Sequence, residues 1–377
     1  MEIETTIVGA GLIGLAIAAE LSRQHRNIYV IESGTTFGAT SSRRPSEVLH
    51  AGLVYSPGSL KARLCKRGNR LLRDLCRTKD IPLRMCGKLI VASNPEEEHQ
   101  LESMARLGQE SGIRGLNLLT GPAAQKMEPQ LRALAALYVP TSGIVDSRQL
   151  IRYFVAQAGM NGVTFVYQTR IQRVVRKEPG LYTVHIVYPD GQLEQFVTRR
   201  LINAAGLDAD QIAAGLGLDI DRLGHRQYPW KGTYYAGRRT PSPLNHIIYP
   251  VPAPRTEGPG VGAWTDLNDR FILGPKAVFL SQSVLDGDGD PDPMDNCFDS
   301  IRRYLPHLRG KDFAPATAGL WPKLSKPGDP ERDFVIQEES SEGFPGIVNL
   351  LGIESPGLTA CMAIAEHVKR LIVWTRL

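Results

Sequence analysis

The chain has 377 residues, which is long enough for two domains with sizeable cores. Its 44 basic and 39 acidic residues leave a formal net charge of +5 that is spread along the chain. Nucleic-acid-binding proteins cluster Lys and Arg, so we expect no nucleic-acid partner. We recognise neither a signal peptide nor an apolar run of ~20 residues, so we expect a cytoplasmic protein without a transmembrane segment, for which peripheral membrane contact stays open. The five cysteines include no C-x-x-C pair, which argues against a disulfide framework and against a metal site.

The first 32 residues predict a compact strand–helix–strand unit. An apolar strand over residues 4–8 leads into a glycine-rich turn over residues 9–14. An Ala/Leu-rich helix over residues 15–21 follows, and a second strand over residues 27–31 ends at Glu32.

Gly9, Gly11 and Gly14 give the turn the spacing G-x-G-x-x-G, directly after a strand and directly before a helix. The first glycine allows the tight turn, the second lets the backbone approach a pyrophosphate, and the third permits close helix–strand packing. The helix start supplies partial positive charge for the phosphates. Glu32 is placed to accept hydrogen bonds from ribose hydroxyls, so the sequence predicts a dinucleotide with an unphosphorylated ribose.

Three further glycine-bearing turns favour FAD over NAD. They are residues 38–44, residues 203–206 at the end of a buried strand, and residues 352–359 at the start of the last helix. An extended FAD needs such dispersed loops, whereas each loop by itself is equally well explained as a helix cap.

The remaining elements follow in chain order. Helices are predicted over residues 60–75, 96–108, 147–158, 294–304 and 357–372. Strands are predicted over residues 89–92, 163–175, 182–187, 192–197, 201–205 and 347–350, with the third and fourth paired across the turn at residues 189–191. Residues 224–279 are rich in aromatics, Pro and Gly, which is typical of an antiparallel sheet.

Several motifs resemble the L-2-hydroxyglutarate dehydrogenases and their bacterial relatives, in the D-amino-acid oxidase-like superfamily. They are SEVLHAGLVYSPGSLKARLC at residues 46–65, CGKLIVA at 86–92, TSGIVD at 141–146, IYPVP at 248–252, LGP at 273–275 and GIESPGLT at 352–359. The resemblance implies an α/β (α+β) protein with a Rossmann-type FAD-binding domain and an inserted, mostly antiparallel-sheet substrate domain. The FAD domain would comprise residues 1–85, 145–215 and 325–377, and the substrate domain residues 86–144 and 216–324.

The residues expected to contact FAD lie in the glycine-rich turns and in the motif around His50. They are Gly9, Gly11, Leu12, Ile13, Gly14, Glu32, Ser33, Thr40, Ser41, Ser42, Arg44, His50, Ala51, Val174, Ala205, Gly206, Gly352, Ser355, Gly357, Leu358 and Thr359.

The resemblance also implies oxidation of a C–H bond next to a carboxylate, with hydride transfer to flavin N5. His50 is the candidate base for the hydroxyl proton, because histidine titrates near neutrality. Lys88 is the candidate for holding a carboxylate or a developing alkoxide. Taken singly, such residues are more often a structural histidine and a solvated strand-end lysine.

The substrate contacts expected from the same motifs are Tyr55, Lys231, Tyr249, Gly262 and Trp321. Here the sequence departs from its relatives, which usually carry Gly-Val-His where this chain has 260–262 and Gly-Ile-Arg-Pro-Lys where it has 319–323. They also carry Arg-Asn-Ser where this chain has 44–46. A tryptophan cannot replace the carboxylate-binding fork of an arginine, and Gly262 was expected to make room. These changes predict a substrate larger or less charged than 2-hydroxyglutarate.

Two other functions stay open. An amine or amino-acid oxidase on the same fold would need His50 less, and a flavin-binding protein without turnover would act by interaction alone. The small-molecule substrate's electrons could pass to oxygen, a quinone or a carrier protein, because the single G-x-G-x-x-G suggests no second NAD domain.

Overall fold

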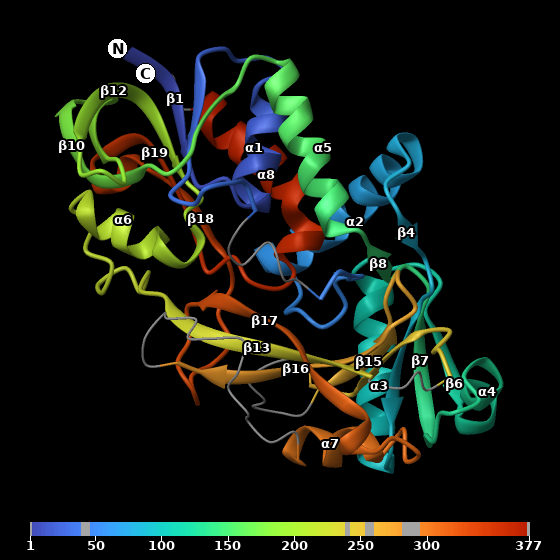
Figure 1. Ribbon diagram of the computed structural model, residues 1–377. Coiled ribbons are helices and arrows are strands. Elements are labelled where there is room, and N and C mark those ends of the chain that lie inside the picture. Colours follow the sequence, from blue (N-terminus) through green and yellow to red (C-terminus); the bar gives the residue numbers. More distant parts are fainter. Residues whose placement is uncertain (1, 39–45, 238–241, 253–259, 281–294, 375–377) are drawn as a thin grey trace.

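Figure 1 shows a molecule of two halves, each built on a large sheet. The computed structural model describes residues 2–38, 46–237, 242–252, 260–280 and 295–374. We call the two sheets the first sheet and the second sheet.

The first sheet is parallel at its centre, in the order β9-β2-β1-β12-β19. The antiparallel strands β11 and β10 continue from the first half of β12, and β18 pairs antiparallel with β19. Its strands are β1 (Glu2–Val8), β2 (Ile28–Ile31), β9 (Thr164–Val166), β10 (Arg170–Glu178), β11 (Leu181–Val187), β12 (Leu193–Asn203), β18 (Val335–Glu339) and β19 (Phe344–Leu351).

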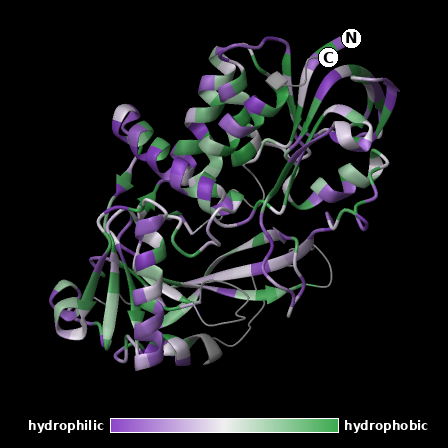
Figure 2. Ribbon diagram, turned by 180° about the vertical axis from the view of Figure 1, so that it is seen from behind, coloured by the Kyte–Doolittle hydropathy of each residue, from purple (hydrophilic) through white to green (hydrophobic). Residues whose placement is uncertain are grey.

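Helices pack on this sheet because their apolar residues match its buried face. The helices of this half are α1 (Leu12–Leu21), α2 (Leu60–Lys79), α5 (Ser147–Met160), α6 (Ala209–Gly215) and α8 (Gly357–Trp374). Nearly every residue of α1 is buried, since the helix is apolar on all sides and lies between the sheet and α5 and α8. Figure 2 shows the hydrophobic colour gathered in the strands and inner helices, with hydrophilic colour on the outer helices and loops.

The second sheet runs in the order β17-β13-β16-β15-β14-β5-β7-β6 and is antiparallel except where β14 pairs with β5. Its strands are β5 (Lys88–Ala92), β6 (Asn117–Thr120), β7 (Ala135–Val139), β13 (Tyr228–Gly237), β14 (Ile247–Pro250), β15 (Gly262–Thr265), β16 (Phe271–Phe279) and β17 (Phe313–Lys323). The helices of this half are α3 (Pro95–Glu110), α4 (Gly121–Met127) and α7 (Asp295–Arg302). A small three-stranded sheet joins β3 (Val48–Leu49), β8 (Gly143–Val145) and β4 (Leu83–Arg84).

The two faces of the second sheet have different neighbours. One face packs Leu89, Phe271 and Leu273 against Phe298 and Ile301 of α7. The other face, which we call the inner face, carries Tyr234, Tyr249 and Trp264 and packs against Val48 and Ile144 of the small sheet. The inner face therefore looks toward the segments that lead into the first half.

The predicted fold class is confirmed: a parallel nucleotide-type sheet is combined with a mostly antiparallel one. Some expectations were wrong in detail. The single strand β12 replaces the two strands predicted over residues 192–197 and 201–205, and residues 163–175 hold β9 and the start of β10. The sequence analysis missed β3, β4, β6, α4, β7, β8, α6, β17 and β18. The hairpin of β11 and β12 is confirmed. The residue boundaries of the two domains stay a prediction. Among the described residues, no helix combines the length and the apolar character needed to cross a membrane.

Candidate functional site

The glycine-rich turn joins β1 to α1 in a conformation that only glycine accommodates. Gly9 has φ +102°, and a Cβ on it would lie 2.5 Å from the carbonyl oxygen of Ala204. A Cβ on Gly14 would lie 2.0 Å from the oxygen of Gly9. Gly11 is the N-cap of α1 and, as a glycine, has no side chain of its own to cap the helix start. The turn therefore brings backbone close to the positive end of a helix without side chains in the way at Gly9, Gly11 and Gly14, which fits a pyrophosphate.

Glu32 orders the loops around that cradle. Its carboxylate accepts hydrogen bonds from the backbone N–H of Ala10 and of Gly34, both at 2.7 Å. Ser33, predicted to touch the cofactor, lies beside it, with its hydroxyl 3.4 Å from the same carboxylate. Oε2, which accepts the N–H of Ala10, has a second lone pair, so Glu32 can still accept a ribose hydroxyl.

The other predicted cofactor loops lie at the same end of the first sheet, where the parallel strands have their carboxyl ends. Ala205 and Gly206 follow the end of β12, and Gly352 follows the end of β19, its parallel neighbour. Carboxyl ends of parallel strands are where doubly wound sheets bind nucleotides. Val174 is buried in the core cluster under β10 and β11. Thr40, Ser41, Ser42 and Arg44 fall outside the described residues.

The segment that contains His50 is hydrogen-bonded to the start of α8 and to the turn before it. The backbone N–H of His50 donates to Oγ1 of Thr359 at 3.0 Å, and the hydroxyls of Tyr55 and Ser355 lie 3.2 Å apart. On the other side, Nδ2 of Asn69 donates to the carbonyl of His50 at 2.9 Å. Asn69 was not expected in the site, and nothing in its local sequence distinguishes it from an ordinary helix residue.

The structure brings His50, Lys88 and Tyr249 together. Nζ of Lys88 lies 3.5 Å from Nδ1 of His50 and 4.7 Å from the centre of the Tyr249 ring. No carboxylate among the described residues pairs with Lys88, although its exposed fraction is only 7%. Burial lowers the pKa of Lys88 from 10.5 to about 8. Burial, and then the charge of Lys88, lower the pKa of His50 well below its ordinary value.

Aromatic side chains line the inner face of the second sheet next to Lys88. The rings of Tyr249 and Trp264 are stacked at 6.4 Å, and Tyr234 meets Trp264 edge-on at 6.0 Å. A Cβ on Gly262 would lie 2.5 Å from the Tyr249 ring. The expectation that Gly262 makes room for substrate was therefore wrong, because Tyr249 fills that space.

Strand register separates the predicted substrate residues of β13 and β17. Trp230 pairs with Trp321, and the Trp321 ring covers Gly232, so these residues share a face. Lys231 pairs with Leu320 and points to the opposite face, because successive side chains of a strand alternate. This placement argues against the predicted contact between Lys231 and substrate.

A lysine of the segment 319–323, which the sequence analysis did not place among the substrate contacts, lies on the Trp321 side instead. Nζ of Lys323 lies 5.8 Å from the Trp321 ring, 5.0 Å from the Trp230 ring and 3.8 Å from Oε2 of Glu354. Glu354 also accepts a 3.0 Å bond from the buried Lys61 at the start of α2. The sequence contained one clue to this group of charges, because Glu354 lies inside the GIESPGLT motif.

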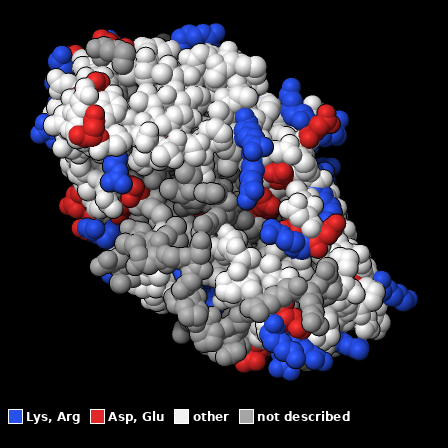
Figure 3. Space-filling view, viewed as in Figure 1, with Lys and Arg blue, Asp and Glu red and all other residues white. Residues whose placement is uncertain are grey.

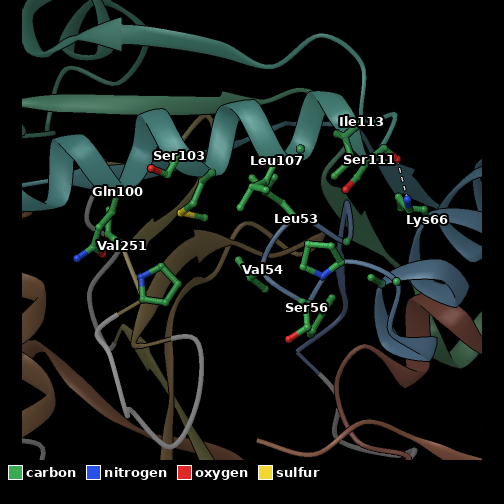
Figure 4. Close-up of a pocket in the computed structure, with 18 of the residues that line it drawn as sticks. Leu53, Val54, Ser56, Lys66, Gln100, Ser103, Leu107, Ser111, Ile113 and Val251 are labelled. Carbon is green, nitrogen blue, oxygen red and sulfur yellow. Dashed lines mark hydrogen bonds between the residues drawn. The ribbon is translucent and has the colours of Figure 1, made fainter.

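A cavity of 630 Å³ is lined by the loop over residues 52–58 (Figure 4). Its walls come from that loop, from α2 and α3, and from the end of β14. Leu53, Val54 and Leu107 give it an apolar lining, and Lys66 donates to the carbonyl of Ser111 at its rim. Tyr55 is both part of this lining and the partner of Ser355.

Charged side chains show no one-sign patch on the face drawn in Figure 3, where blue and red groups are interspersed. In the described part of the chain, no group of three or more His, Cys, Asp or Glu residues could hold a metal ion.

Comparison with known proteins decides the family. Residues 4–371 match the DAO family, described as FAD dependent oxidoreductase. The chain belongs to this family. It is therefore an FAD-dependent oxidoreductase, and the cradle of Gly9 and Gly14 fits the cofactor that the family uses.

Similar proteins carry names from two substrate classes. The mitochondrial L-2-hydroxyglutarate dehydrogenase of Arabidopsis thaliana is 36% identical over 402 residues, covering 97% of this chain and 82% of the relative. The human protein of that name is 28% identical, covering 97% and 87%. A glycerol 3-phosphate dehydrogenase of Caloramator mitchellensis is 27% identical, covering 97% and 72%.

A solved structure shares the fold over the whole chain. L-alpha-glycerophosphate oxidase from Mycoplasma pneumoniae with FAD bound has a TM-score of 0.84 at 24% identity, covering 99% of this chain and 95% of that one. Several relatives are named as mitochondrial, so the expected cytoplasmic location stays a prediction.

Proposed function

We propose that the protein oxidises a 2-hydroxy acid at the C–H bond beside the carboxylate, with bound FAD as the hydride acceptor. The observation that carries this proposal is the buried pair of Lys88 and His50 beneath Tyr249. The 36% identity to an L-2-hydroxyglutarate dehydrogenase supports the same substrate class. When bound, FAD supplies a flavin N5 that accepts hydride.

We infer that the cofactor's pyrophosphate lies on the start of α1 and that its adenosine ribose faces Glu32. The turn from Gly352 to Thr359 would then lie beside the flavin end, because it contacts both His50 and Tyr55. In this arrangement the candidate base lies beside the flavin end of the cofactor.

Lys88 is suited to recognise an anion. A buried ammonium without a carboxylate partner is unfavourable, so Lys88 gains from any anion that enters beside it. A substrate carboxylate or a developing alkoxide supplies that charge and raises the fraction of Lys88 that is protonated.

His50 is suited to take the hydroxyl proton. Its lowered pKa keeps the imidazole neutral at physiological pH, and a neutral imidazole has one nitrogen that accepts a proton. The 3.5 Å contact with Lys88 is long for a hydrogen bond. A substrate anion can therefore draw the ammonium away and leave His50 available as the base.

The inner face supports a substrate with an apolar portion. The ring of the partly exposed Trp321 stands where related proteins usually place an arginine, and the buried rings of Tyr249 and Trp264 make the surroundings apolar. Burial raises the pKa of Tyr249 well above its ordinary range, so its hydroxyl stays a neutral donor. A larger, less charged acid than 2-hydroxyglutarate fits this surface better.

Anaerobic reduction of the bound flavin tests the proposal. L-3-phenyllactate and L-phenylalanine differ only in that the first has a hydroxyl group where the second has an amino group. L-2-hydroxyglutarate has a second carboxylate in its side chain in place of the aromatic ring. We expect fast bleaching with phenyllactate and slower bleaching with the other two compounds. Faster reduction by phenylalanine would identify an amino-acid oxidase, and no reduction by any 2-hydroxy or 2-amino acid would contradict the proposal.

The same experiment addresses the electron acceptor. Oxygen, a soluble quinone or a carrier protein is added to the reduced enzyme, and the return of flavin absorbance is timed. The fastest partner under matched concentrations identifies the class of acceptor.

A further inference from the structure

One buried amide joins two of the loops predicted to hold the cofactor. Oε1 of Gln227 accepts the backbone N–H of Gly352 at 2.7 Å, and Nε2 of Gln227 donates to the carbonyl of Gly206 at 2.8 Å. Its own backbone N–H donates to Oδ2 of Asp210 at 3.0 Å. Gln227 precedes β13, in the part of the chain expected to belong to the substrate domain.

An amide matches the chemistry of the two loops. The backbone N–H of Gly352 can only donate, and the carbonyl of Gly206 can only accept. A bridging side chain must therefore offer one acceptor and one donor at the same end. Glutamine does this, whereas a carboxylate lacks the donor and an apolar side chain lacks both.

The bridge lies where the cofactor is expected. Gly206 follows β12 and Gly352 follows β19, and these parallel strands are paired through Asn203 and Asn349. Ligands of such sheets bind outside the carboxyl ends of the strands. Ladder hydrogen bonds end with the strands, so the spacing of the loops beyond them depends on side chains.

We propose that Gln227 is a positioning residue for FAD, because its amide fixes the distance between the loops at Gly206 and Gly352. The proposal rests on the inferred place of the cofactor but not on the identity of the substrate. Gln227 acts through the two backbones, and both loops must keep their spacing for the cofactor to contact them together.

The substitution Gln227→Glu tests the bridge by titration. A neutral carboxyl still donates to the Gly206 carbonyl, but a carboxylate repels it. Burial and the neighbouring Asp210 raise the pKa of the introduced carboxyl. We expect the FAD dissociation constant, divided by that of the unchanged protein at the same pH, to be about ten- to a hundred-fold higher at pH 8 and near unity at pH 5.

Gln130→Glu is the matched control, because Nε2 of Gln130 also donates to a backbone carbonyl, that of Ser242, at 3.0 Å. We expect this control to leave the FAD dissociation constant unchanged at both pH values. A similar loss in both variants, or no pH dependence in Gln227→Glu, would overturn the proposal.

Gln227→Met keeps the size of the side chain and removes both hydrogen bonds, so it serves if the first variant does not fold. We expect weaker FAD binding at both pH values, without recovery at pH 5. Wild-type affinity in this variant would overturn the proposal. Gly11→Val separately tests the place of the cofactor on α1: if it retains full FAD affinity, the inferred cofactor site fails whatever Gln227 does.

Discussion

The backbone N–H of His50 and the side-chain hydroxyl of Thr359 are joined by a 3.0 Å hydrogen bond across 309 residues of sequence. Thr359 is fully buried and lies in the first turn of α8, and its hydroxyl lies 3.5 Å from the carbonyl of Val48. The position of the candidate base is therefore set by the helix start that we place beside the flavin.

Thr359→Val should disturb this connection while keeping the shape of the side chain. It leaves a buried N–H without its acceptor, which costs about 1–3 kcal/mol of stability. We expect a lower melting temperature and slower flavin reduction. Thr359→Ser keeps the hydroxyl and should reduce at close to the wild-type rate; a larger loss in Thr359→Ser than in Thr359→Val would show that the methyl group, not the hydrogen bond, is what counts.

His50→Ala is expected to retain FAD and to slow single-turnover flavin reduction by roughly 10²- to 10⁴-fold, the usual range for a lost general base. His99→Ala is the control, because His99 lines the 630 Å³ cavity and its side chain is 79% exposed. Stopped-flow absorbance of the flavin provides the measurement. An unchanged rate in His50→Ala across pH would remove His50 from the chemistry.

Lys88→Met should stabilise the protein and damage its function. The folded pKa of about 8 lies below the ordinary 10.5, so the unfolded chain binds more protons between these values and stability rises with pH across that window. Below pH 8 the full cost of burying Lys88 remains, roughly 3 kcal/mol for this shift. We expect Lys88→Met to melt higher at pH 7, to lose the pH-dependent rise between pH 8 and 10.5, and to raise the KM for a 2-hydroxy acid. Equal melting curves across pH would contradict this account.

Trp321→Arg should improve reduction by L-2-hydroxyglutarate by about ten- to a hundred-fold, because an arginine adds charge-assisted hydrogen bonds worth roughly 1.5–3 kcal/mol. Adding Gly262→His should not help, since the new side chain collides with the Tyr249 ring and disrupts its stacking on Trp264. Comparing kcat/KM of the single and double variants tests both statements. A better double variant would mean that Tyr249 moves away at little cost.

Local patterns in the sequence predicted the strand–helix–strand unit in which we expect the cofactor to bind, and the structure contains this unit. The turn from Gly9 to Gly14 and the acid at Glu32 follow from short-range geometry, since each lies within or beside one strand–helix–strand unit. The fold class followed from the order of the predicted elements and from the family motifs.

The substrate half depends on strand register, which the sequence does not determine. A shift of one residue in β13 would move Lys231 from one face of the sheet to the other. Without the register, Lys231 was predicted to contact the substrate, whereas in the structure Lys323 is the lysine near Trp321. Likewise, only the pairing of β14 with β15 reveals that Tyr249 covers Gly262. Gln227 was missed because both of its partners are backbone groups in distant loops, which leave no trace in the neighbouring residues.

The central strands β1, β12 and β19 come from residues 2–8, 193–203 and 344–351, and α8 follows them. During synthesis, α1 therefore leaves the ribosome long before the helix that covers it, and its apolar surface waits for more than 300 residues of chain. Such exposed surface invites aggregation or chaperone binding. The turn that we place beside the flavin comes directly before α8, the last of the described elements. We therefore expect FAD to bind only chains in which this helix has already emerged.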